Sequence, residues 1–233
     1  MQDLETHLKR QLEHSRDFFW HRLRWRAVRS WLPARAPFTL LDVGAGAGLL
    51  GDYLRRDYPQ GSYRYIEPIA SLAAGLRERF GADNERKPGD TRGASHLALL
   101  DVLEHQQDNA AFLASLVAGA DKGALIVLTV PALPLLWSRW DTLLGHYRRY
   151  TRATLRAAVR GLPVEVLEQS YLFPEMIPPA LLRRNRRERE GEAEFPDLPR
   201  WVNDALFAAG SVSLALRRFV PAGTSLLLVL RKT

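Results

Sequence analysis

The chain carries its clearest structural signal at residues 40–50, LLDVGAGAGLL. This run indicates an apolar strand that ends near the acid Asp42, followed by three alternating glycines and the start of a helix. Glycine suits such a turn because a Cβ atom would obstruct the backbone angles and the close approach of a ligand. The first amides of the helix then face that ligand, with the positive end of the helix dipole behind them. The run therefore predicts a loop that binds a nucleotide-like cofactor.

The spacing of the glycines separates two kinds of cofactor loop. The dinucleotide fingerprint is Gly-x-Gly-x-x-Gly, but Leu49 holds its third glycine position here, and the glycine falls one residue earlier, at Gly48. Glu67 ends the next predicted strand, where a carboxylate can accept hydrogen bonds from both ribose hydroxyls of an adenosyl group. NAD enzymes use the same device, so Glu67 indicates adenosine binding without naming the cofactor. A tight βα turn without a ligand is the alternative interpretation.

Length and composition narrow the class of protein. The chain has 233 residues, of which 46% are hydrophobic, enough for one α/β domain with elaborations. It contains no cysteine, so disulfides and thiolate chemistry are excluded and a cytoplasmic location is expected. No apolar run approaches the roughly 18 residues of a membrane-spanning helix, and the N-terminus lacks the pattern of a secretory signal. The formal net charge of +7 favours anionic partners, although a GC-rich genome explains the many arginines equally well.

Hydrophobic patterns predict strands that alternate with helices. The strands are predicted at 38–43, 62–67, 96–100, 123–130, 164–171 and 225–230. Such alternation implies a doubly wound, mostly parallel sheet in an α/β fold. We expect a single domain made of an N-terminal helical cap, a cofactor-binding core, a helical insertion and a last strand, at residues 1–35, 36–172, 173–222 and 223–233. Residues 82–96 lack a clear strand pattern, so the third strand of such a sheet is expected to be short or degraded.

Several motifs together resemble one known family. Residues 42–48, Asp-x-Gly-x-Gly-x-Gly, resemble the first motif of the class I S-adenosylmethionine (SAM) dependent methyltransferases. Residues 101–105, Asp-Val-Leu-Glu-His, look like the fourth-strand motif of the type 11 and ubiquinone-pathway methyltransferases, and 130–132, 136–141 and 145–150 (GHYRRY) continue the resemblance. It implies a Rossmann-like sheet of seven strands, with SAM as the cofactor. The residues predicted to contact that cofactor are Asp42, Gly44, Ala45, Gly46, Glu67, Pro68, Asp90, Asp101, Val102 and Leu103.

The resemblance implies transfer of a methyl group to a small or lipid-linked acceptor, at an oxygen atom. An oxygen nucleophile benefits from a general base. His146 is the first candidate for that base, because its loop should lie over the strand ends and a histidine pKa can lie near neutrality. His105 is the second candidate. Either histidine can instead hydrogen-bond its own loop in place.

Three further residues are candidates for contact with the acceptor. Arg148 and Arg149 carry planar guanidinium groups that form paired bonds to a phosphate or carboxylate. Alternatively, they brace their loop against Asp141. Trp137 can wall an apolar acceptor pocket, or it can pack as part of a lid.

A metal centre is a further possibility that the motifs raise. The resemblance to ubiquinone-pathway enzymes suggests that Asp101, Glu104 and His105 together ligate a divalent ion. Adjacent glutamate and histidine side chains at a helix start do not readily converge on one ion without other ligands. We therefore predict a site without a metal.

Two rival functions belong to other classes. A nucleic-acid-directed methyltransferase agrees with the charge, but basic residues alternate with acids, as in RERE at 187–190, and no nucleic-acid recognition module appears. A noncatalytic scaffold with this fold at a membrane face agrees with the stretch 173–182, which precedes an arginine cluster at 183–189. The preferred hypothesis is an enzyme that can contact a membrane peripherally and does not act on nucleic acid.

Overall fold

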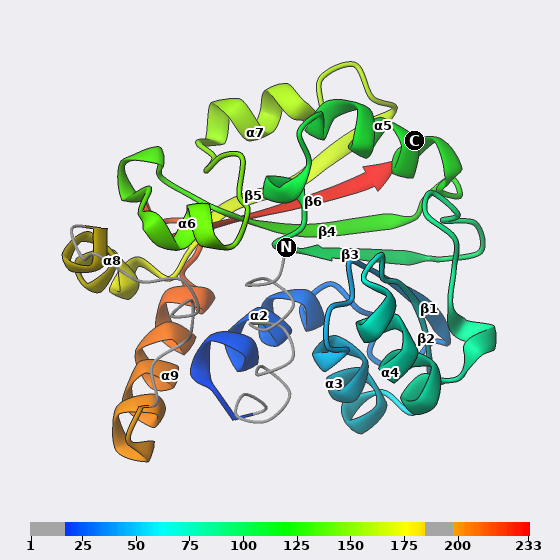
Figure 1. Cartoon of the computed structure of the whole chain (residues 1–233), viewed down its shortest axis with the longest axis horizontal. Helices are drawn as coiled ribbons and strands as arrows, with labels where there is room; N and C mark the ends of the chain where they lie inside the picture. The colour runs from blue at the N-terminus through cyan, green and yellow to red at the C-terminus, as the bar shows by residue number, and fades with distance from the viewer. Residues whose placement is uncertain (1–16, 185–197) are drawn as a thin grey trace.

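The computed structural model describes residues 17–184 and 198–233 (Figure 1). Its strands are β1 (Phe38–Val43), β2 (Gly61–Ile66), β3 (His96–Leu100), β4 (Leu125–Pro131), β5 (Val164–Leu172) and β6 (Ser225–Lys232). Its α-helices are α2 (Phe19–Arg29), α3 (Leu49–Asp57), α4 (Ala70–Phe80), α5 (Asn109–Gly119), α6 (Arg139–Leu143), α7 (Arg152–Ala158), α8 (Ile177–Arg184) and α9 (Arg200–Ala215). Short 3₁₀ helices are η1 (Ala82–Asn84), η2 (Leu103–His105), η3 (Pro134–Leu136) and η4 (Pro174–Met176). Residues 1–16 of the predicted cap and 185–189 of the predicted arginine cluster lie outside the described ranges.

The described strands form one sheet in the order β2-β1-β3-β4-β6-β5. The strands β1 to β4 run parallel, and β6 is antiparallel to both β4 and β5. Strands covered on both faces should be nearly continuously apolar, and Leu226 to Leu230 of β6 are indeed fully buried. The order reverses between β1 and β3, so their carboxyl ends flank the crevice where open α/β sheets bind ligands. The predicted doubly wound, mostly parallel α/β fold is confirmed.

The prediction of seven strands is wrong for the described residues, which contain six. An isolated parallel bridge between Tyr65 and Glu85 lies where the extra strand would pair with β2, and Arg86 N donates to Tyr65 O at 2.8 Å. The following residues, 85–93 (ERKPGDTRG), offer no large apolar side chain to a core, and Pro88 lacks a backbone donor. The weak strand expected within 82–96 is therefore reduced to a single bridge.

The core lies in two layers, one on each face of the sheet (Figure 1). Side chains of β3 alternate between them, as successive residues of a strand must. Leu97 and Leu99 join a layer with Leu113 of α5 and Leu155 of α7, whereas Ala98 joins the layer formed with α2, α3 and α4. This alternation fixes the register of β3 and the position of the residues that follow it.

The helices α8 and α9 follow β5 and project beyond the sheet, and α9 lies beside α2 (Figure 1). Asn203 Oδ1 on α9 accepts a hydrogen bond from Phe19 N at 2.8 Å. The Arg22 guanidinium of α2 lies 3.5 Å from the centroid of the Phe207 ring. These contacts join the N-terminal helix to the insertion on one side of the crevice. Within the described residues, no helix has the length and apolar character needed to cross a membrane.

Candidate active site

The glycine-rich loop between β1 and α3 has the backbone conformation that its sequence predicts. Gly44, Gly46 and Gly48 have φ angles of 72°, 55° and 78°, a region that side chains with a Cβ rarely adopt. A Cβ atom at Gly44 would lie 2.7 Å from Val102 Cγ2, and one at Gly48 would lie 2.5 Å from Leu76 Cδ2. At these two positions the loop has room for backbone alone.

A cavity of about 820 Å³ opens beside this loop. Its volume is in the range that encloses a small-molecule ligand. The polar wall includes eight of the sequence-predicted residues together with Glu104: Asp42, Gly44, Ala45, Gly46, Asp101, Glu104, His105, His146 and Arg149. The apolar wall comes mainly from α2, α6, α8 and the segment leading into α9, and includes Phe18, Phe19, Trp20, Trp140, Met176, Pro179, Ala180, Leu182, Leu198 and Leu206.

Asp42 is a buried acid in this cavity. Its Oδ2 accepts a hydrogen bond from the Tyr63 hydroxyl at 2.8 Å. Burial raises the pKa of Asp42 to about 7, against the opposing effect of the Tyr63 hydrogen bond. The raised pKa brings the titration of Asp42 toward the neutral range. Its partner Tyr63 is not among the site residues that the sequence predicts.

Glu67 supports the glycine-rich loop from outside the cavity wall. Its carboxylate accepts hydrogen bonds from Gly46 N at 2.6 Å and from Ile69 N at 2.8 Å. Burial raises the pKa of Glu67, and the two backbone hydrogen bonds partly offset that rise. Glu67 is not among the described residues that line the cavity, so its contact with a ribose stays a prediction.

Four other residues expected at the cofactor lie away from the cavity. Val102 packs against the glycine-rich loop, and Leu103 is fully buried in the core. Pro68 is exposed, and Asp90 pairs with Arg92 at 2.9 Å. Since none of the four is among the described lining residues, their cofactor contacts also stay predictions.

Asp101 connects the N-terminal helix to the end of β3. Its φ angle of 57° lies in the left-handed region, which aspartate tolerates better than most residues. One carboxylate oxygen lies 3.1 Å from Arg24 Nη1, and the other accepts a hydrogen bond from Thr129 Oγ1 at 3.1 Å. One turn before Arg24, Trp20 stacks on Phe173 with ring centroids 3.9 Å apart. The helix α2 thus closes one side of the cavity.

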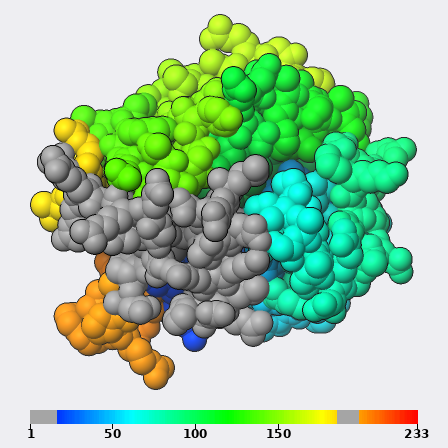
Figure 2. All heavy atoms as spheres, viewed as in Figure 1, coloured from blue at the N-terminus to red at the C-terminus, as the bar shows by residue number. Residues whose placement is uncertain are grey.

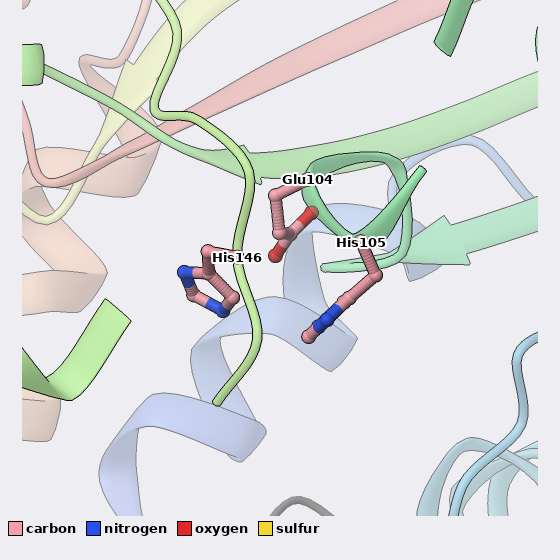
Figure 3. Close-up of side chains that lie close together, drawn as sticks. All are labelled: Glu104, His105 and His146. Carbon is pink, nitrogen blue, oxygen red and sulfur yellow. The ribbon is translucent and has the colours of Figure 1, made fainter. Parts of the chain in front are cut away.

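Glu104, His105 and His146 converge on the cavity (Figure 3). Glu104 and His105 belong to η2, whereas His146 comes from the loop after α6. Glu104 is fully buried, and neither of its carboxylate oxygens has a hydrogen-bond partner in the described structure. Burial and the nearby Asp101 raise the pKa of Glu104 well above its usual value of 4.5. The carboxyl group therefore favours its neutral, protonated form.

The same cluster contains the donor types of a metal site. One ligand-type atom from each of Glu104, His105 and His146 lies within 4.8 Å of the others. Burial and His146 lower the pKa of His105 to about 4, so its ring is neutral near pH 7 and able to ligate. Tetrahedral zinc needs ligand atoms only about 3.3 Å apart, so the side chains would have to close in. Asp101, the third ligand suggested by sequence, is bound to Arg24 instead, and a site without a metal stays a prediction.

His146 is oriented by a buried acid. Its Nδ1 lies 2.9 Å from Oδ1 of the fully buried Asp141. Burial alone would raise the pKa of Asp141, but hydrogen bonds with His146 and Arg149 hold it below its usual value. An ionised carboxylate accepts hydrogen bonds only, so the neutral imidazole carries its proton on Nδ1 and keeps a lone pair on Nε2. Nε2 can therefore accept a proton in the cavity.

The sequence indicates Asp141 only as a brace for the arginines. A usable signal was present, because Ser138 and Asp141 form the capping box that begins α6. Asp141 accepts from Ser138 N at 2.9 Å and from Arg149 Nε at 2.8 Å. These bonds hold the acid rigidly beneath His146.

Of the three residues predicted to contact the acceptor, the structure places one at the cavity and two away from it. Arg149 lines the cavity and also braces the loop. Arg148 Nη2 donates to Gln107 O at 2.6 Å, and Trp137 is half-buried; neither is among the described lining residues. Trp140 lines the cavity in place of Trp137. Acceptor contacts of all these residues remain predictions.

No protein-family model and no curated protein matches the chain. Solved structures do match. A chain from the complex between the Haloferax volcanii Trm112 methyltransferase activator and its methyltransferase partner has a TM-score of 0.62 at 16% identity, over 97% of this chain and 93% of that one. The S-adenosylmethionine dependent methyltransferase from Mesorhizobium loti has a TM-score of 0.59 at 14% identity, over 90% and 98%. The [4+2]-cyclase SpnF has a TM-score of 0.56 at 17% identity, over 90% and 80%.

At these identities the matches establish the fold. The chain has the Rossmann-like α/β fold of the class I methyltransferases. The matches support the broad part of the resemblance and do not extend to the type 11 or ubiquinone-pathway enzymes. Because one structure of this shape is named a cyclase, the reaction has to be argued from the site.

Proposed function

We propose that the chain is a SAM-dependent methyltransferase. The observation that carries this proposal is the glycine-rich loop, with three positive φ angles, opening onto a cavity that also contains the Asp141-oriented His146. A loop of this kind at the switch point of an open α/β sheet suits the phosphate or sugar part of a nucleotide-like ligand. The likeness to a structure named as a SAM-dependent methyltransferase supports SAM among such ligands.

The cavity residues fit a cationic adenosyl ligand. When bound, SAM supplies an electron-poor methyl group on a sulfonium. Asp42 and Asp101 both face the cavity. Asp101 is paired with Arg24, so Asp42 in its ionised form is the carboxylate that would favour the positive charge of such a ligand. Glu67 would reach the ribose by exchanging its hydrogen bond from Gly46 N for bonds from the two hydroxyls.

The proposed acceptor is a small or lipid-linked molecule with a hydroxyl group. The apolar wall suits an apolar body. His146 Nε2 would take the proton of the acceptor hydroxyl that receives the methyl group, and Asp141 would stabilise the resulting imidazolium. The resemblance of residues 101–105 to ubiquinone-pathway enzymes supports oxygen as the acceptor atom.

Calorimetric titration with SAM, S-adenosylhomocysteine and NAD tests the cofactor assignment. We expect micromolar binding of both adenosyl ligands and no binding of NAD. Glu67→Ala should weaken SAM binding substantially without unfolding the protein, whereas Glu165→Ala, an exposed change on β5, serves as the matched control. Unchanged affinity in Glu67→Ala would refute the ribose contact. A wild-type protein that binds neither adenosyl ligand would overturn the proposed function and favour a noncatalytic scaffold.

A further inference from the structure

We propose that the outer face of α9 docks on a bilayer that contains anionic lipid and so brings the cavity to the membrane surface. Trp201 and Val212 are 75% and 61% exposed, and they share one face because eleven residues make about three helical turns. Leu216 and Phe219 extend the surface just beyond the helix and are 53% and 85% exposed. We call these four residues, with the exposed Ala205 and Ala208 between them, the apolar face of α9.

The opposite side of α9 is already packed. Gly210 lies so close to α2 that a Cβ atom there would be 2.2 Å from Leu23 Cδ1. Phe207 lies beneath the Arg22 guanidinium at 3.5 Å, and Asn203 accepts a hydrogen bond from the backbone of α2 at 2.8 Å. The helix therefore cannot roll its apolar face inward without losing these contacts. In Figure 2, α9 (orange) protrudes from the body of the molecule.

Charge around the apolar face identifies the partner. Arg200 begins α9, and Arg218 lies between Leu216 and Phe219 with 69% of its side chain exposed. Arg218 and Arg217 share one carboxylate, Glu168, at 3.4 and 2.6 Å, so one positive charge there is in excess. Asp204 is the acidic residue of α9, and it lies 3.6 Å from Arg22. Exposed aromatic and aliphatic side chains bordered by arginines are typical of helices that lie on anionic lipid.

A second copy of the chain fits this face less well than a bilayer. A two-fold interface brings the same surface together from both subunits. Arg200 and Arg218 would then approach their own copies, and like charges repel. Phosphate headgroups instead attract Arg200 and the excess positive charge beside Glu168, and the formal net charge of +7 adds a favourable long-range attraction.

The helix that carries the apolar face also contributes to the apolar part of the cavity. Leu182 of α8 and Leu206 of α9 line that part, and both helices contact η4. Leu182 itself is 76% exposed. An acceptor with an apolar tail can stay in the bilayer while its hydroxyl group reaches His146. This last step rests on the proposed function, whereas docking of the apolar face does not.

Co-sedimentation with vesicles tests the docking. Wild-type protein should sediment with phosphatidylcholine vesicles that contain phosphatidylglycerol, much less with phosphatidylcholine alone, and less at high salt. Replacing Trp201 and Phe219 together by serine should lower the partition coefficient at least about tenfold, because each ring loses its burial in lipid. Phe219→Trp should retain binding, and Val166→Ser, at an exposed apolar position on β5, is the control for general loss of apolar surface.

SAM titration of the same proteins separates the two proposals. The serine variant should bind SAM as the wild type does, since Trp201 and Phe219 are not among the described cavity residues. Wild-type protein that sediments with neither kind of vesicle overturns the docking, even where it binds SAM. Vesicle binding without SAM binding overturns the proposed function alone. The wild type could also form a dimer without binding vesicles, and the serine variant could abolish that dimer. This result would assign the apolar face of α9 to contact with a second copy and would overturn the docking.

Discussion

The buried carboxyl group of Glu104 should lower the stability of this protein, so Glu104→Met should raise it. Glu104 is fully buried, and neither carboxyl oxygen has a described hydrogen-bond partner. A buried polar group without a hydrogen bond costs about 1–3 kcal/mol. Methionine has a similar size and no such group, so we expect the variant to gain about 1–3 kcal/mol in free energy of unfolding near pH 5.

The gain from Glu104→Met should increase with pH. Burial raises the pKa of Glu104 well above 4.5, so above pH 4.5 the unfolded chain loses a proton that the folded protein keeps. This group therefore lowers wild-type stability by about 1.4 kcal/mol for each pH unit, until the pH reaches the pKa of the folded state. Methionine does not titrate. The difference in free energy of unfolding between the variant and the wild type therefore reports the titration of Glu104 alone, without that of other groups such as Asp42.

Urea denaturation at several pH values between about 5 and 7 measures both effects. Glu104→Gln is the matched control, because it removes the titration but keeps an unsatisfied polar group. It should lose the pH dependence and gain little stability near pH 5. A methionine variant less stable than wild type near pH 5, or a difference that does not change with pH, would refute the reasoning. Either result would mean that an ionised carboxylate is held by a partner.

Three further changes test the site. Gly44→Ala should abolish SAM binding in calorimetry and cost about 1–2 kcal/mol, because its φ is 72° and Val102 Cγ2 would lie 2.7 Å from the new Cβ; complete rescue by Val102→Ala would contradict the backbone part of this explanation. Asp141→Asn should reduce the preference for the proton on His146 Nδ1, seen as a shift of the ring nitrogen resonances in NMR, and unchanged resonances would contradict the orientation derived from the 2.9 Å contact. Chelation of divalent cations should leave the thermal midpoint unchanged, since the cluster atoms spread over up to 4.8 Å. Zinc stabilisation of wild type that is lost in His146→Ala would contradict this expectation.

The fold was largely readable because each buried strand carries its own local signal. Leu226 to Leu230 form one apolar run, and this run alone identifies a strand covered on both faces. The one strand that was expected and is missing lacks this local signal. Residues 85–93 have no such run, and the structure reduces the expected strand to one bridge between Tyr65 and Glu85. The predicted number of strands was wrong because the resemblance implied seven, whereas the local sequence at residues 85–93 does not support the weakest of these strands.

The sequence predicts those site residues that lie at the ends of strands. Asp42 and Asp101 follow apolar runs, and parallel strands bring such ends together. The side-chain pairs were not readable. Tyr63 reaches Asp42 from the neighbouring strand, and its position in an apolar pattern suggested only packing. Glu67, predicted at a ribose because of its place after β2, instead accepts a hydrogen bond from Gly46 N in the glycine-rich loop.

The unfavourable features of this protein gather around one cavity, which argues for function. Asp101 has a left-handed backbone, Glu104 is buried without a partner, and Trp201 exposes its ring beside the helices that wall the cavity. The first two features lower stability by an amount that matters in a fold stable by only about 5–15 kcal/mol. Local conflicts with the rules of folding tend to mark functional sites. Stabilising changes at these positions should therefore impair binding or catalysis, so Glu104→Met should make the protein harder to unfold and less active.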